Sequence, residues 1–270
     1  MNVDFDKFPE FTREPADFYH SQATNCLSSH QLIDYMESPR LYFRKFCGAA
    51  KRSSSAAFEL GRAVHSLVLE GRDAFDAEFA TTDGAPRNPN SGEIYGATSK
   101  AYKEWAAKES RTILTPSQVE LVEASRQSVA SCRRASELLT NGVAELVGRA
   151  EYCGLRCQIR CDWIRRDGIL IDYKTCDRLD YFESDARRYR YFNQAAFYRA
   201  IVERIVGERF GFYFIATEKR EPFATGVFPV VGLDRAQAEN ERAIERLKRS
   251  WDEMYWPTGW EEERVLCYDG

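Results

Sequence analysis

The sequence predicts an α/β fold in which a central mixed β-sheet is flanked by helices. Helical spacing and helix-start signals dominate the first half of the chain, strand-like segments joined by turn signals cluster at residues 150–173, and a helix followed by two more strands comes after them. This order of elements is typical of a sheet covered by helices. We expect residues 1–27 to form an irregular arm and residues 28–270 to form a single domain.

The N-terminal helices are predicted from their first residues. Ser28, with Gln31 three residues later, is a capping-box signal that opens a helix, which Pro39 interrupts. Apolar residues at helical spacing predict a second helix from residue 58 to about Gly71, after a polar connector at residues 51–55.

Further along, a loop is expected at residues 81–96, which are rich in Gly, Pro, Asn and Ser. Thr115 and Gln118 form another capping box, with Pro116 at the first helical position, and predict a helix towards residue 131 or beyond.

The first hairpin of the strand cluster is predicted at Cys153-Gly154. A tight turn there places Glu151 opposite Arg156 on the polar face of the sheet. After the cluster, the pattern predicts a helix at residues 187–206, strands at residues 209–217 and 223–230, and a last helix capped by Asp234.

The second hairpin contains Asp167-Gly168, and its loop length decides which side chains share a face. A two-residue loop places Asp172 on the face opposite to Asp162. A three-residue loop over residues 166–168, with Gly168 in the left-handed conformation, pairs Asp162 with Asp172.

Composition narrows the class of protein. A chain of 270 residues with 44% apolar residues can bury a substantial core. It has no apolar stretch of membrane-spanning length and no secretory signal, so we expect a cytoplasmic protein without membrane association. The eight cysteines include no C-x-x-C pair, and the pattern favours buried thiols over a metal or iron–sulfur site.

Net charge is −4, so nucleic-acid binding would need basic residues gathered at a cleft. Such residues are concentrated in one stretch of the sequence, namely Arg156, Arg160, Arg165, Arg166, Lys174, Arg178, Arg187, Arg188, Arg190 and Arg199. Each of them could equally be a solvated surface arginine or lysine.

Asp162, Asp172 and Lys174 are the strongest candidates for chemistry. Residues i and i+2 of a strand share a face, so Asp172 and Lys174 point the same way. Opposed carboxylates at Asp162 and Asp172 require a cation between them, and a lysine beside a bound metal can orient water or stabilise developing charge. A D-x-K triplet alone is more often an ordinary solvated strand face.

Three further side chains can be interpreted either as functional or as purely structural. His65 is either a metal ligand, with Gly61 one turn earlier leaving room for close approach, or a packed core histidine. Gln194 and Tyr198 share a helix face at i, i+4 and either grip a phosphate backbone or form an ordinary polar face with a half-buried tyrosine.

In order and spacing, these motifs resemble the PD-(D/E)XK nuclease superfamily, and most of all its RecE-type branch (exodeoxyribonuclease VIII). The matching stretches are residues 57–65, 160–162, 171–175 and 191–198, and the resemblance covers about residues 28–230. Cys161 stands where the superfamily name has proline, and Asp172 is a permitted variant. The C-terminal cysteine cluster of the iron–sulfur relatives is missing from this sequence.

The resemblance implies a restriction-endonuclease-like core with a metal site. His65, Asp162, Asp172 and the Tyr173 carbonyl would bind one or two Mg²⁺ or Mn²⁺ ions, and Lys174 would orient or activate the attacking water. Glu151 matches an acidic position on the preceding strand and would serve in the outer shell.

The resemblance also implies contacts with DNA. Gln194 and Tyr198 would contact it near the site, and Arg160, with Arg40 and Arg44, is a candidate for binding a 5′-phosphate.

The implied function is hydrolysis of double-stranded DNA from 5′ ends in recombination or repair. The family's ring-shaped homo-oligomers thread the duplex and often work beside a single-strand annealing protein. Two alternatives remain: an endonuclease on the same core, and a catalytically silent DNA-binding relative.

Overall fold

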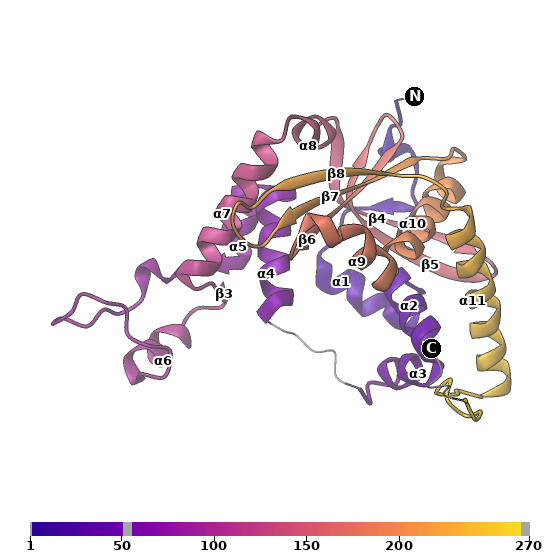
Figure 1. Ribbon diagram of the computed structural model, residues 1–270, viewed down its shortest axis with the longest axis horizontal. Coiled ribbons are helices and arrows are strands. Elements are labelled where there is room, and N and C mark those ends of the chain that lie inside the picture. The colour runs from indigo at the N-terminus through magenta and orange to yellow at the C-terminus, as the bar shows by residue number, and fades with distance from the viewer. Residues whose placement is uncertain (1, 51–55, 266–270) are drawn as a thin grey trace.

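The computed structural model describes residues 2–50 and 56–265, and its centre is a six-stranded mixed sheet (Figure 1). The strand order is β1-β4-β5-β6-β7-β8, and β6 runs parallel to β7 while the other neighbouring pairs are antiparallel. The strands are β1 (Phe11–Thr12), β4 (Gly142–Tyr152), β5 (Leu155–Arg165), β6 (Ile169–Cys176), β7 (Gly211–Glu218) and β8 (Thr225–Val230). The predicted mixed sheet flanked by helices is confirmed.

Helices cover both faces of this sheet. One face carries α2 (Ser29–Glu37), α3 (Pro39–Phe46), α10 (Tyr191–Val206) and α11 (Asp234–Glu253). The other carries α4 (Ala56–His65), the π-helix η3 (Ser66–Glu70), α5 (Arg72–Glu78), α7 (Pro116–Ser131) and α8 (Arg133–Leu138). Side chains of β6 alternate between the two layers: Leu170 packs in the first, and Ile171 and Tyr173 pack in the second.

Shorter elements complete the chain. They are η1 (Phe5–Lys7), α1 (Ala16–Ser21), η2 (Gln22–Thr24), β2 (Phe79–Ala80), η4 (Thr82–Gly84), α6 (Lys100–Ala106), β3 (Thr112–Ile113), η5 (Leu179–Tyr181) and α9 (Phe182–Arg188). The segment between α5 and α7, with α6, extends away from the body of the molecule, and its two ends are joined by the parallel β2–β3 pair (Figure 1). Within the described residues, we find no helix with the length and apolar character needed to cross a membrane.

The predicted helix starts are confirmed in detail. Ser28 and Gln31 make both hydrogen bonds of a capping box, and so do Thr115 and Gln118, with Pro116 at the first helical position. The predicted interruption at Pro39 is confirmed, because α2 ends before it and a separate helix, α3, begins at Pro39 with Ser38 as its N-cap. The connector at residues 51–55 and Cys267 lie outside the described residues, and the seven other cysteines are free thiols.

Four expectations about element boundaries are wrong. Residues 2–27 are not an irregular arm, because Phe11 and Thr12 pair with β4 at the edge of the sheet and Phe5 is buried in the core. The strand expected from residue 150 begins at Gly142. The helix expected at residues 187–206 is two helices, because Arg190 adopts a left-handed conformation between α9 and α10. Asp234 is the first residue of α11 rather than its cap.

Both predicted hairpins form, the first in the predicted register and the second with the three-residue loop of the two alternatives. Glu151 lies opposite Arg156, and Cys153 and Gly154 both have positive φ, which matches a type I′ turn. Arg165 lies opposite Ile169, so the second loop has three residues and ends at Gly168, whose φ is 89°.

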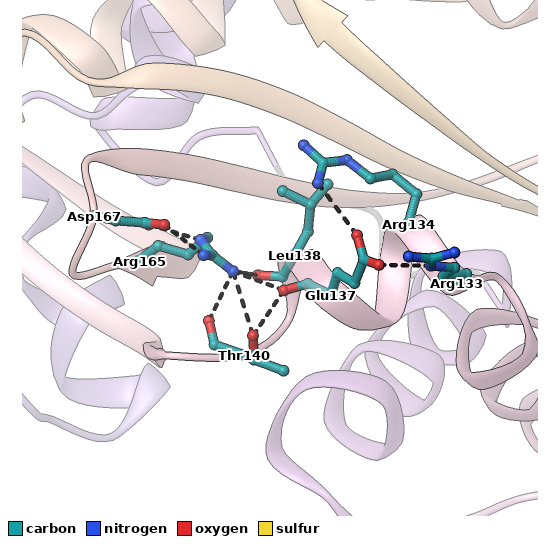
Figure 2. A network of polar contacts seen from close by, with 7 residues as sticks. All are labelled: Arg133, Arg134, Glu137, Leu138, Thr140, Arg165 and Asp167. Atoms are coloured by element: carbon teal, nitrogen blue, oxygen red, sulfur yellow. Dashed lines mark hydrogen bonds and ion pairs between the residues drawn. The ribbon is translucent and has the colours of Figure 1, made fainter.

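Arg165 fixes this second hairpin to the end of α8 (Figure 2). Its Nη1 donates to the carbonyl oxygens of Glu137 at 2.7 Å, Leu138 at 3.0 Å and Thr140 at 3.0 Å, while Nε and Nη2 donate to the Asp167 carboxylate. The last carbonyls of a helix have no partner within the helix, so one guanidinium satisfies three of these acceptors around the end of α8.

We predict that Arg165→Ala lowers the free energy of unfolding by about 1–3 kcal/mol, because it leaves the carbonyls at the end of α8 without their shared donor. Arg133→Ala is the matched control, since Arg133 pairs with Glu137 through a side chain that is 92% exposed and should cost about 0.5 kcal/mol or less. Chemical denaturation measures both. Equal losses in the two variants would contradict the anchoring role of Arg165.

Candidate active site

The candidate site lies where β5 and β6 separate. Their pairing ends at Trp163 opposite Ile171, so the Tyr173 backbone has no β5 backbone partner. Side chains take its place: the Tyr173 N–H donates to Asp162 Oδ2 at 2.7 Å, and the Tyr173 carbonyl oxygen is 2.9 Å from His65 Nε2. Because backbone polar groups away from water need partners, the site residues also complete the interrupted ladder.

His65 lies at the C-terminal end of α4, directly before the π-helical turn of η3, and its ring reaches into this gap. Nε2 is 3.2 Å from Asp162 Oδ2, and Nδ1 is 3.7 Å from Glu145 Oε1. A Cβ added to Gly61 would meet no atom within 4 Å, so no neighbouring strand packs closely enough to require glycine there. Room for a metal at this position stays a prediction.

Glu145 is the site residue that sequence reasoning missed. The register on either side, Ala144 opposite Trp163 and Leu146 opposite Cys161, places it across from Asp162. Its φ is +54°, an uncommon conformation for glutamate within a strand, and such outliers concentrate at functional sites. The available signal was a single acid within the apolar run of residues 142–147, a segment that was not predicted to be strand.

These groups form a donor set that could hold a divalent cation. One ligand atom each from His65, Glu145 and Asp162 lie within 4.8 Å of one another, and the Tyr173 carbonyl contacts the same imidazole nitrogen. Carboxylate and carbonyl oxygens with one imidazole suit Mg²⁺ or Mn²⁺. Asp172 is outside this three-residue group, so its part as a ligand stays a prediction.

Asp172 belongs to a second group, on the α10 side of β6. Its Oδ2 is 2.6 Å from Lys174 Nζ, as expected for residues that share a strand face. Gln194 joins the two side chains, because its Nε2 donates to Asp172 Oδ1 at 2.9 Å and its Oε1 accepts from Lys174 Nζ at 3.1 Å. Gln194 therefore positions both charged groups.

Tyr198, one helical turn after Gln194, is also buried against the site. Gln194 is 4% exposed and Tyr198 is 5% exposed, so neither has an open path to a phosphate backbone in this conformation. Burial, with contributions from Tyr19, Asp162 and Asp172, raises the pKa of Tyr198 well above its ordinary value and keeps the hydroxyl protonated. Contact of these two side chains with DNA stays a prediction.

The negative charge of the site carboxylates is balanced by His65 and Lys174, because both side chains keep their protons at neutral pH. Burial acts to lower the pKa of His65, but Asp162 and Glu145 outweigh it and raise the pKa to about 9. Burial raises the pKa of Asp172 to about 6, although Lys174 opposes this shift. Burial also acts to lower the pKa of Lys174, and the neighbouring Asp172 and Asp162 raise it instead. At neutral pH the site therefore holds an imidazolium and an ammonium among its carboxylates.

The remaining predicted residues are dispersed. Arg160 lies at the site, with Nε 2.7 Å from Glu145 Oε2, whereas Arg40 and Arg44 are exposed on α3, at the end of the molecule beside α11 (Figure 1). Glu151 is exposed beside the Cys153-Gly154 turn, six residues and roughly 20 Å along β4 from Glu145. The expected outer-shell place of Glu151 is therefore wrong, and the β4 acid that lies at the site is Glu145.

The arginine-rich stretch is likewise not one surface. Arg165 holds the end of α8, Arg166 donates to the Val3 carbonyl, and Arg199 pairs with Asp234. An open cavity of about 570 Å³ adjoins the site at Glu145 and Arg160. Its lining carries both signs of charge, because Arg13 and Arg62 face it together with Glu14, Glu70 and Glu78.

We predict that Ca²⁺ binding at pH 7.5 releases about one proton per ion, because His65 is protonated below a pKa of about 9 and only the neutral ring ligates metal. Affinity should therefore rise with pH up to that value. Calorimetry in buffers of different ionisation enthalpy measures the released proton. His65→Gln should abolish the release and His30→Gln, on exposed α2 surface, should keep it; undiminished release in His65→Gln would exclude His65 as a ligand.

Comparison with known proteins agrees with this architecture. A crystal structure from Eubacterium rectale, described as a "Putative exonuclease", is similar with a TM-score of 0.67 and 17% identity over 95% of each chain. The likeness to the structure of SSO0001 is low, with a TM-score of 0.30, 14% identity, and coverage of 48% of this chain and 68% of that one. No curated protein matches the sequence. Residues 28–265 match the family described as a PDDEXK-like domain of unknown function (DUF3799), and the chain belongs to that family.

Proposed function

We propose that this protein is a metal-dependent nuclease that hydrolyses phosphodiester bonds of DNA. The observation that carries the proposal is the convergence, at the β5–β6 split, of the His65–Glu145–Asp162 donor set with the Asp172–Lys174 pair. A metal-binding group beside a carboxylate–lysine pair can supply a polarising ion, an activated water and a donor for developing charge, which together suit phosphodiester hydrolysis. The PDDEXK-like family and the similar crystal structure from Eubacterium rectale support the same activity.

A bound divalent ion would polarise the phosphoryl oxygens and lower the pKa of a water molecule. His65, Glu145, Asp162 and the Tyr173 carbonyl are the groups that would hold it. Lys174 keeps its proton at neutral pH, so it acts as a donor that orients water or stabilises charge on phosphate oxygens, rather than as a base. Gln194 fixes the direction of that donor.

We further propose, from the resemblance to RecE-type exonucleases, that the substrate is double-stranded DNA degraded 5′→3′ from its ends. A role in recombination or repair, a ring-shaped homo-oligomer and an annealing partner belong to the same proposal. The presence of His65, Asp162, Asp172, Lys174 and the Gln194–Tyr198 helix at the matching motif positions is what supports it.

An endonuclease on the same core is the second candidate. The groups at the β5–β6 split could cleave a phosphodiester bond, but none of them selects a DNA end over an internal bond. A catalytically silent relative is disfavoured by the full set of polar groups at the site, which such a relative would have lost.

We expect cleavage of linear duplex DNA with Mg²⁺ or Mn²⁺, and binding without cleavage with Ca²⁺, because hydrolysis needs a small, strongly polarising ion. Gel analysis of labelled duplexes with each ion measures this. Full activity in excess EDTA would overturn the metal dependence.

Asp162→Asn, Asp172→Asn and Lys174→Ala should each reduce cleavage by about a thousandfold or more, and their combinations should lose little further activity because the groups act as one unit. The matched controls are Asp252→Asn and Lys100→Ala, at exposed positions on α11 and α6, which should retain full activity. Unfolding midpoints confirm that each variant is folded. A double variant far weaker than either single one, starting from appreciable residual activities, would contradict a shared site.

End preference separates the two candidates. An exonuclease should degrade linear duplexes, leave a closed circle intact and release label from the 5′ end first. Comparing duplexes with and without a 5′-phosphate measures its role in end recognition. Linearisation of the closed circle by wild type, abolished in Asp172→Asn, would favour the endonuclease.

A further inference from the structure

Two tyrosines connect the site to the protein surface. Lys174 Nζ is 4.8 Å from the centroid of the Tyr191 ring, and the Tyr191 ring is 5.8 Å from that of Tyr189, tilted by 31°. Tyr191 is half-buried against Phe182 and Phe214, whereas Tyr189 is 49% exposed. A continuous aromatic path therefore runs from the ammonium of the site to solvent.

The break between α9 and α10 creates this path. Residues i and i+2 of an unbroken helix do not face each other, so Tyr189 and Tyr191 would diverge in the single helix that the sequence suggested. Arg190 between them has φ 57° and ψ 36°, a left-handed conformation that is unfavourable for a residue with a Cβ. The chain turns at this residue, and the two rings come into contact.

Arginines accompany the exposed rings. The Arg188 guanidinium lies 5.3 Å from the Tyr189 ring centroid, and Arg178 lies 5.4 Å from that of Tyr181, which is 57% exposed. Exposed aromatic rings interleaved with cations are the means by which proteins bind single-stranded nucleic acid, since bases stack on the rings and the cations attract phosphates. Burial in the core does not explain Tyr189 or Tyr181.

We propose that the surface around Tyr189 and Arg188 holds the unpaired nucleotides of a DNA end next to the bond being cleaved, with Tyr189 as a stacking platform for one base. The proposal rests on the proposed nuclease function and names the form of DNA that the site accepts. The two steps of 4.8 and 5.8 Å from Lys174 to Tyr189 together span at most about three nucleotides at about 3.4 Å each. A base on Tyr189 thus lies within a few nucleotides of the scissile phosphate.

A base that stacks on Tyr189 cannot pair with its complement at the same time, so a duplex end must open by a few nucleotides before cleavage. Ends with mismatched terminal nucleotides already have these bases free and should be preferred over fully paired ends.

The first test is binding without cleavage, with Ca²⁺ as the ion and a duplex whose mismatched end carries the fluorescent base 2-aminopurine. Stacking on an aromatic ring quenches this base. We expect quenching by wild type and by Tyr189→Phe, which keeps the ring, and its loss in Tyr189→Ala, with affinity lowered about fivefold or more. Tyr255→Ala is the matched control, because Tyr255 is a tyrosine with 57% exposure beyond the end of α11, and it should behave as wild type.

The second test is the rate of cleavage of mismatched, paired and abasic ends with Mg²⁺. Wild type should prefer mismatched ends, and Tyr189→Ala should lose that preference through a higher KM, as should wild type on an end whose terminal bases are removed. Unchanged quenching and unchanged preference in Tyr189→Ala would overturn the proposal. If wild type cleaves no DNA, the nuclease function fails, and the quenching measurement still decides whether Tyr189 stacks on a base.

Discussion

The interruption of the β5–β6 ladder is the constraint on which the rest of the site depends. Pairing stops at Trp163 and Ile171, and the backbone of Tyr173 then needs partners from elsewhere. Asp162 supplies an acceptor for the N–H and His65 contacts the carbonyl oxygen. The same side chains thus stabilise an opened sheet and assemble a donor set, so a change at Asp162 affects both the ladder and the donor set.

Electrostatic balance explains how so many acids coexist in a partly buried gap. Like charges in a low-dielectric site raise each other's pKa, and a cation offsets this cost. Cations at this site are the His65 imidazolium, the Lys174 ammonium and the Arg160 guanidinium, consistent with a His65 pKa of about 9. By linkage, the stability from the raised His65 pKa is fully present below the ordinary value of 6.5 and is lost as pH rises through about 9. A divalent ion would replace the imidazolium proton with a stronger positive charge.

Two irregular points in the helices bring side chains to positions that a regular α-helix would not allow. The π-helical turn directly after His65 changes the helix geometry at the point where its ring enters the gap. The left-handed Arg190 separates α9 from α10 and brings Tyr189 beside Tyr191, at the outer end of a path that begins at Lys174. Both irregularities lie directly beside site residues, where stored backbone strain is commonly found.

Sequence alone determined the local parts of this protein. The capping boxes at Ser28 and Thr115, the hairpin at Asp167-Gly168 and the shared face of Asp172 and Lys174 depend on residues close together in the chain, where periodicity and turn chemistry suffice. Tertiary structure decided that Glu145 rather than Glu151 faces Asp162, that Arg165 anchors a helix end and that Gln194 holds Lys174. These contacts join segments 17 or more residues apart, and local patterns do not encode how far a strand extends or where two strands separate.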